Sequence, residues 1–258
     1  METSLSLIKQ HMNALNIPAA AGILDELLIK AQNSDFTYQE FIHQLLDHEI
    51  TTREKRRLEN QLKLAAFPEY KTLDAFDISE QKSLSQKQLN QLKELHWLEQ
   101  AYNLILLGPP GVGKSHLAIG LGLRAVQMGY KVHFTSMDDL VGLLKTQEIT
   151  RSARAKLKRL TNSDLVIIDD LMFMAIYSQE ANLFFQLINK LYGQVSIIIT
   201  SNKGPQEWGE MLGDPAITTA ILDRILHKSE VLTFTENSYR LKHRQTIFGS
   251  LNQLATKI

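Results

Sequence analysis

Residues 104–115 constrain the fold of this chain more than any other stretch. Four apolar residues, 104–107, are followed directly by GPPGVGKS and then by a helix-forming segment. A buried strand, a glycine-rich loop and a helix start in this order are typical of a P-loop, which binds the phosphates of a nucleotide. With Gly at about 7% of residues, the motif GxxxxGK[ST] should occur by chance in roughly 1% of chains of this length. The alternative is an ordinary glycine turn followed by a surface lysine.

Each part of the loop has a physical role in holding phosphate. Gly108, Gly111 and Gly113 permit a tight turn whose N–H groups point at phosphate oxygens. The helix expected to begin near Lys114 adds its N-terminal dipole. Lys114 reaches the β- and γ-phosphates, and the Ser115 hydroxyl is suited to hold Mg²⁺. The predicted nucleotide site consists of Gly108, Pro109, Pro110, Gly111, Val112, Gly113, Lys114, Ser115 and His116.

Composition favours a folded chain and excludes several kinds of site. The 258 residues are 44% hydrophobic and 22% charged, include no cysteine and carry a formal net charge of +0. Without cysteine, disulfides and thiolate metal sites are excluded. Charged residues interrupt each apolar run, and the N-terminal segment lacks the apolar core of a secretory signal, so we expect a cytoplasmic protein with no membrane partner. Any contact with nucleic acid must come from local basic clusters.

The first part of the chain has a helical pattern of apolar residues. Residues 4–64 keep a spacing of three to four, with Pro18 suited to a first helical turn and Thr37 with Glu40 forming a capping box. Residues 65–85 show no sustained period, and residues 85–100 give another helix. We predict a helical N-terminal domain over residues 1–66, a connector over 67–84 and an ATPase domain over 85–258.

From residue 102 onward, strand and helix patterns alternate. Strands are expected at 102–107, 131–135, 164–169, 195–200 and 230–234, and helices at 115–128, 137–147, 152–161, 179–191 and 215–226. Such alternation is typical of parallel strands covered on both faces, with ligands at the carboxyl ends of the strands. The predicted fold class is therefore α/β, with a five-stranded parallel sheet behind a small all-helical domain.

Two acidic residues end the apolar strand LVIIDD at 165–170. A P-loop ATPase needs carboxylates opposite its phosphate loop. We expect Asp169 to hold Mg²⁺, directly or through water, and Asp170 to orient or deprotonate the attacking water. The alternative is a strand that merely ends in exposed acids.

The strand IIITSN at 197–202 ends in a second set of polar residues. In a parallel sheet its tip lies beside the other two, so the Asn202 amide is a candidate for positioning water against the γ-phosphate. A plain strand-terminating turn is the competing interpretation. A GTPase would have NKxD here, whereas the chain has Asn202-Lys203-Gly204-Pro205, which favours ATP.

Arginines and lysines supply the remaining candidates. Arg224, on the helix before the last strand, could act as an arginine finger on a neighbouring subunit or form an ion pair with Asp223 or another acid. Two basic clusters could track DNA phosphates, or could simply be solvated faces. Their members are Arg53, Lys55, Arg56 and Arg57 in the first part, and Lys145, Arg151, Arg154, Lys156, Lys158 and Arg159 before the LVIIDD strand.

These segments together resemble the IstB-like ATP-binding proteins, transposition helpers of the IS21 group of insertion sequences. The resemblance covers nearly the whole chain. It rests on FIHQLLDHEITTREKRRLENQLKLAAFP and KTLDAFD in the first part, and on GPPGVGKSHLA, LVIIDD, TSN, LDRIL and SYRLKHR in the second. The first set is the more specific, because many ATPases share the P-loop and the acidic strand.

The resemblance implies a AAA+ ATPase core behind a helical DNA-binding domain. It also implies ATP- and DNA-dependent assembly of copies of this chain on duplex DNA, and guidance of a partner transposase to target sites. The site roles that it implies are Walker A contacts for Lys114 and Ser115, a Walker B pair of Asp169 and Asp170, a sensor role for Asn202 and an arginine finger for Arg224.

The chain departs from many relatives at two places. Asp170 is followed by Leu171-Met172-Phe173, where relatives have Asp-Glu and a Gly-Tyr-like pair. The short stretch after the fifth expected strand predicts little or no C-terminal lid, leaving Arg240 and Arg244 as candidates for a second sensor.

Three other functions remain open at this point. A helicase loader of the DnaC type would share the ATPase domain, although the basic N-terminal helix favours DNA over helicase docking. A small-molecule kinase would need an acceptor pocket and an arginine-bearing lid, and the sequence has no such segment. A nucleotide-dependent scaffold would bind ATP with negligible hydrolysis.

Overall fold

The computed structural model describes residues 4–171, 177–209 and 214–243, and the chain divides into two compact units at residues 1–60 and 61–258. The first unit contains α1 (Ser4–Ala14), α2 (Pro18–Gln32) and most of α3 (Tyr38–Ala65). Pro18 occupies the first turn of α2, and Thr37 and Glu40 form the predicted capping box at the start of α3. The predicted helical character of residues 4–64 is confirmed.

A small apolar core holds these helices together. Met12 from α1 packs with Ala20, Ala21 and Leu24 from α2, and Phe41 and Leu45 from α3 cover the cluster. Ile17, at the cap position of α2, offers no side-chain hydrogen bond. The buried carboxylate of Glu49 on α3 takes that role, because it accepts a 2.9 Å hydrogen bond from the Ala20 amide.

The second unit is built on a five-stranded parallel sheet in the order β2-β3-β4-β1-β5. The predicted fold class is confirmed. Its strands, each within two residues of its expected position, are β1 (Asn103–Leu107), β2 (Val132–Ser136), β3 (Leu165–Leu171), β4 (Ser196–Ser201) and β5 (Ser229–Thr233). β1 and β4 are buried along their whole length and β3 is buried up to Ile168, which is typical of parallel strands with both faces covered.

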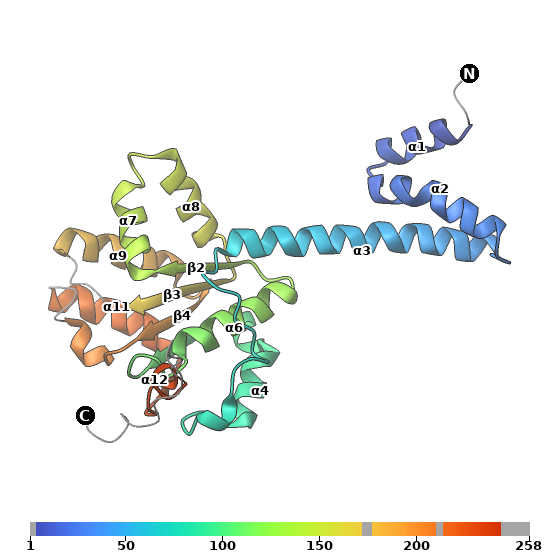
Figure 1. Cartoon of the computed structure of the whole chain (residues 1–258). Coiled ribbons are helices and arrows are strands. Elements are labelled where there is room, and N and C mark those ends of the chain that lie inside the picture. The colour runs from blue at the N-terminus through green and yellow to red at the C-terminus, as the bar shows by residue number, and fades with distance from the viewer. Residues whose placement is uncertain (1–3, 172–176, 210–213, 244–258) are drawn as a thin grey trace, which may run out of the picture. The chain divides into compact units, whose positions relative to one another are not determined.

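Helices cover both faces of this sheet (Figure 1). One face packs against α7, α8, α9 and α11 through alternate strand residues such as Ile105, Val166 and Ile199. α6 and α4 lie on the other side, where a Cβ at Gly122 of α6 would meet Ile167 at 2.7 Å. The helices of these two layers are α4 (Gln86–Glu94), α6 (Lys114–Gln127), α7 (Met137–Thr146), α8 (Arg151–Thr161), α9 (Ser178–Leu191) and α11 (Pro215–His227).

The predicted connector packs on the second unit. Leu73 lies against Gly120 and Phe67 against Gly122, so these helical glycines make room for the connector. A short 3-10 helix, η1 (Ile78–Glu80), leads to α4, and a second one, η2 (Pro205–Glu207), follows β4. No helix among the described residues is long and apolar enough to cross a membrane.

The single helix expected over residues 85–100 is wrong. Leu95 adopts a left-handed conformation with φ of 61° and separates α4 from the short α5 (His96–Glu99). The Leu95 side chain is completely buried, and the Trp97 indole donates a hydrogen bond to the Leu92 carbonyl at the end of α4. The spacing of apolar residues predicts one continuous helix here. The break at Leu95 coincides instead with burial of its side chain and with the Trp97 hydrogen bond.

The contact between Glu49 and α2 generates a prediction about stability. Burial opposes ionisation of Glu49, but hydrogen bonds from the Ala20 amide and Arg53 outweigh it and lower the pKa of the carboxyl below its ordinary 4.5. A lowered pKa means that the stabilisation is complete above pH 4.5 and disappears as the pH falls through the folded-state value. We expect Glu49→Ala to reduce the opening free energy of α2 by about 2 kcal/mol at neutral pH.

Hydrogen exchange of the α2 amides in the full chain measures this effect. Glu59→Ala, which removes an exposed glutamate from the same helix, is the control and should leave exchange unchanged. Equal protection of α2 in Glu49→Ala and the wild-type protein would contradict the capping role.

Candidate functional site

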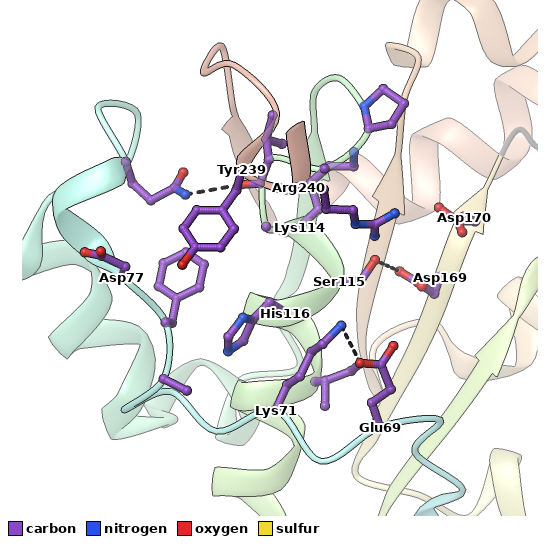
Figure 2. A pocket seen from close by; sticks show the side chains of 18 of the residues that line it. Glu69, Lys71, Asp77, Lys114, Ser115, His116, Asp169, Asp170, Tyr239 and Arg240 are labelled. Carbon is purple, nitrogen blue, oxygen red and sulfur yellow. Dashed lines mark hydrogen bonds and ion pairs between the residues drawn. The ribbon is translucent and has the colours of Figure 1, made fainter. Parts of the chain in front are cut away.

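A cavity of about 570 Å³ lies at the carboxyl ends of the central strands. The P-loop, the end of β3 and Asn202 after β4 line it, together with the connector and α12 (Tyr239–Lys242). Figure 2 shows Lys114, Ser115, Asp169 and Asp170 around this space, together with Tyr239 and Arg240 from α12. The structure therefore brings together the three strand ends that the sequence singled out.

The P-loop has the backbone that its glycines predict. Gly108, Gly111 and Gly113 have φ values of 142°, 83° and 100°, in a region that side chains disfavour. Residues 110–116 line the cavity. Gly108 and Pro109 instead contribute their carbonyl groups, which accept hydrogen bonds from Lys114.

Lys114 links the P-loop to the end of β4. Its ammonium donates to the carbonyls of Gly108 and Pro109 at 2.7 and 2.8 Å and to Asn202 Oδ1 at 2.8 Å. The residue is only 5% exposed. Burial lowers the pKa of Lys114, and the nearby carboxylates of Asp170 and Asp169 partly oppose that shift. The resulting buried cation at the cavity wall is suited to bind phosphate oxygens.

Ser115 and Asp169 both line the cavity and are in direct contact. The Ser115 hydroxyl donates a 2.8 Å hydrogen bond to Asp169 Oδ1, marked by a dashed line in Figure 2. A hydroxyl and a carboxylate beside a phosphate site match the oxygen ligands that Mg²⁺ uses in nucleotide-binding proteins. The donor set of these two residues therefore fits a magnesium ion shared with phosphates.

Asp170 also lines the cavity, with a backbone φ of 55°. Burial raises the pKa of Asp170, and the charge of Asp169 raises it further. A carboxylate with a raised pKa is a stronger proton acceptor than one in water.

His116 and the connector form the opposite wall. The His116 ring packs edge-on against Phe76 with 5.4 Å between the centroids, and its Nε2 lies 2.9 Å from the Thr72 carbonyl. Gln81 donates to the Val112 carbonyl at 3.1 Å. These contacts fix the connector beside the P-loop, so the connector is part of the site.

Comparison with known proteins agrees with this geometry. The family model for IstB-like ATP-binding proteins matches residues 10–247. The chain belongs to this family. A protein named for ATP binding in insertion sequence IS21 of Pseudomonas aeruginosa is 42% identical over 91% of this chain and 88% of its own length. A similarly named protein of Bacteroides fragilis is 36% identical over 98% of both chains.

Solved structures share the fold of this IstB-like chain. The crystal structure of the DnaC helicase loader has a TM-score of 0.52 at 24% identity and covers 64% of this chain and 96% of that one. AMPPCP-bound DnaA from Aquifex aeolicus has a TM-score of 0.54 at 24% identity, covering 68% of this chain and 53% of that one. Both likenesses support the α/β fold described above.

Arg224 does not line the cavity of its own chain. Its guanidinium donates to Asn189 Oδ1 at 3.0 Å and to the Ala220 carbonyl at 2.8 Å, and lies 4.9 Å from the Phe185 ring centroid. Within the described ranges, Arg224 forms no ion pair with Asp223 or another acid. In the IstB-like protein, the contacts of Arg224 within the described residues are therefore with α9 and with its own helix.

The two basic clusters are exposed, but not every cation in them is unpaired. Arg53 forms a 2.6 Å ion pair with the buried Glu49, and Lys145 forms a 2.8 Å pair with Glu180. Arg154 donates weakly to two carbonyls near the end of α7. The other members named from the sequence are exposed on α3, in the first unit, and on α8, in the second.

Sequence reasoning missed the extent to which the segment after β5 belongs to the site. The Tyr239 amide donates to the Gly111 carbonyl at 2.9 Å, and Glu236 accepts two 2.7 Å hydrogen bonds from the amides of Lys82 and Ser83. Arg240, one candidate second sensor, lines the cavity. The other candidate, Arg244, and the C-terminal residues 244–258 lie outside the described residues. In the sequence, the SYRLKHR segment of the family resemblance was the one indication that these residues belong to the site.

The close packing of the P-loop predicts a sharp difference between two glycine substitutions. A Cβ at Gly108 would lie 2.4 Å from the Phe234 carbonyl oxygen, and its φ of 142° disfavours any side chain. We expect Gly108→Ala to displace the loop and weaken ATP binding at least tenfold, roughly the effect of an ångström-scale misplacement.

The matched control is Gly142→Ala in α7, where a Cβ would have nothing within 4 Å. That change should leave ATP affinity unaltered and raise stability by about 0.5–1 kcal/mol. Titration with a fluorescent ATP analogue and thermal melting measure the two quantities. Wild-type affinity in Gly108→Ala would contradict the expected strain.

Proposed function

We propose that this chain is an ATP-hydrolysing, DNA-binding AAA+ protein that assembles on duplex DNA and assists a transposase in choosing its target. The convergence of Lys114, the Asp169–Asp170 pair and Asn202 on one cavity carries the proposal for ATP hydrolysis. Membership of the IstB-like family, with relatives named for insertion sequences, supports a role in transposition.

Each residue has a defined task in this proposal. Lys114 binds the β- and γ-phosphates, and Asn202, already bonded to Lys114, orients water near them. Ser115 and Asp169 would hold Mg²⁺, which would supply positive charge to offset the charge developing on phosphoryl oxygens. Asp170 orients the attacking water and accepts its proton.

Arg224 supplies the link between ATP and assembly. It does not line the cavity of its own chain and bonds to Asn189 instead, so we assign it to the γ-phosphate of a neighbouring subunit. An arginine acting in trans makes hydrolysis depend on correct contact between copies. ATP bound at such a contact stabilises the assembly, and hydrolysis weakens it.

Duplex DNA is the proposed polyanion. The exposed cations of α3 and α8 would contact phosphates without reading bases, as suits a protein that accepts many targets. A helicase loader is the second candidate, because the fold of DnaC is similar. The insertion-sequence relatives, at much higher identity over nearly the whole chain, favour transposition.

Electron microscopy and salt-dependent DNA binding test the proposed assembly. Filaments or rings on DNA should form with ATP and duplex DNA together, and not with either omitted. We expect Arg56→Ala and Lys158→Ala each to reduce the slope of log affinity against log salt by about 1, since each removes one phosphate contact.

Three controls make that test specific. Lys87→Ala removes an exposed lysine outside both clusters and should leave the slope unchanged. Arg53→Ala and Lys145→Ala should reduce it less than Arg56→Ala, because a carboxylate already neutralises each cation. An unchanged salt dependence of DNA binding in variants of both clusters would overturn the proposal. So would a pull-down with this protein that recovers a replicative helicase in place of the transposase.

Mixing two inactive variants tests the trans arginine. Arg224→Ala keeps an intact carboxylate pair, whereas Asp170→Asn keeps an intact arginine. In an equal mixture, half of the subunits retain Asp170 and half of those adjoin an intact Arg224, so about a quarter of the wild-type DNA-stimulated ATPase rate should return. Asn189→Ala, which removes one hydrogen-bond partner of Arg224 and leaves the arginine in place, should stay active. A mixture no more active than its separate components would exclude action in trans.

A further inference from the structure

The two acidic residues of β3 lie on the same cavity although they are consecutive in a strand. Successive side chains of a regular strand point to opposite faces. Both Asp169 and Asp170 nevertheless line the cavity. The pairing of β3 with β4 is regular up to Ile168 and Ile199 and resumes only at Leu171 and Ser201. Two residues of β3 therefore stand opposite one residue of β4, which is the pattern of a β-bulge.

That single opposing residue is Thr200. Its side chain is completely buried, and its hydroxyl makes two hydrogen bonds to the bulge. The Thr200 hydroxyl accepts from the Asp170 amide at 2.9 Å and donates to Asp169 Oδ1 at 2.6 Å. One hydroxyl thus contacts the backbone of one acid and the carboxylate of the other.

The hydrogen bond from the Asp170 amide compensates for two costs of the bulge. The Asp170 amide is left without a regular strand partner, and a buried amide without a partner is costly. Asp170 also adopts a φ of 55°, which is unfavourable for a residue with a side chain. The hydrogen bond from its amide to Thr200 holds the backbone in this conformation and so directs the Asp170 side chain.

At Asp169 the hydroxyl fixes one carboxylate oxygen. Asp169 Oδ1 accepts from both Thr200 and Ser115, at 2.6 and 2.8 Å. Two donors converging on one oxygen restrict rotation of the carboxylate. Asn202, two residues beyond Thr200, bonds to Lys114. The end of β4 therefore contacts the acidic pair and the P-loop lysine at the same time.

We propose that Thr200 is a positioning residue that sets the orientation of both Asp169 and Asp170. The inference rests on the proposed function, in which these carboxylates hold magnesium and activate water. Thr200 touches neither the nucleotide nor the ion in this scheme. It acts through the two acids.

Three substitutions separate positioning from general packing. Thr200→Val keeps the shape and removes the hydroxyl, and Thr200→Ser restores the hydroxyl with a smaller side chain. Thr135→Val is the matched control, since Thr135 is a buried threonine on β2 that lies outside the cavity lining and whose hydroxyl bonds to the Ser136 carbonyl. Thr200→Ala replaces Thr200→Val if the valine variant fails to fold.

The first readout requires neither nucleotide nor metal. Loss of the hydroxyl should raise hydrogen exchange at the Asp170 amide by about tenfold in Thr200→Val, because the amide loses its partner. Thr200→Ser and Thr135→Val should keep the wild-type exchange rate there. Unchanged protection in Thr200→Val would overturn the proposal, even if the protein bound no ATP and the proposed function failed.

The second readout is the magnesium dependence of ATP binding and turnover. In Thr200→Val, ATP affinity in EDTA should equal that of the wild type, whereas the Mg²⁺ concentration for half-maximal effect should rise by about 10- to 100-fold, as with other residues that orient metal ligands. Thr200→Ser should restore the wild-type value. Wild-type magnesium dependence in Thr200→Val, or an equal loss in Thr135→Val, would reduce Thr200 to an ordinary core residue.

Discussion

The candidate site depends on the parallel alignment of three neighbouring strands at the centre of the sheet. In the order β3-β4-β1, the acidic pair lies near the end of β3, Asn202 follows β4 and the P-loop follows β1, so all three meet at one edge of the sheet. Adjacent strands lie about 4.8 Å apart, which brings groups from distant parts of the sequence within the span of a triphosphate. Lys114 depends on this alignment directly, since its buried ammonium is held between P-loop carbonyls and the Asn202 side chain.

This protein has local clusters of charge but no overall net charge. The formal net charge is +0, yet basic residues gather on α3 and α8. Two of the predicted phosphate contacts also have a structural partner in the fold. Arg53 neutralises a buried glutamate that caps α2, and Lys145 pairs with Glu180 at the start of α9. A cation that already balances a carboxylate contributes less to a phosphate contact than a solvated one.

Much of the second unit could be read from the sequence, because its signals are local. Each strand is an apolar run, and the P-loop combines a strand, glycines and a helix start within a dozen residues. The connector and the segment after β5 gave no such signal. They belong to the site through long-range contacts, such as those from Glu236 to the amides of residues 82 and 83 and from Tyr239 to Gly111. The helix break at Leu95 was missed for a similar reason, since burial in the folded unit accompanies it.

The sequence by itself determined which residues could bind phosphate, which could hold magnesium, and that the strands must be parallel. Those properties follow from residue chemistry and from the periodicity of short segments. Only the tertiary structure decided how the two aspartates share one cavity, because strand periodicity alone would send them to opposite faces. The bulge at Asp169 and Asp170, its contact with Thr200 and the position of Arg224 outside its own cavity all depend on pairings between distant segments. Such pairings form only when the whole sheet assembles.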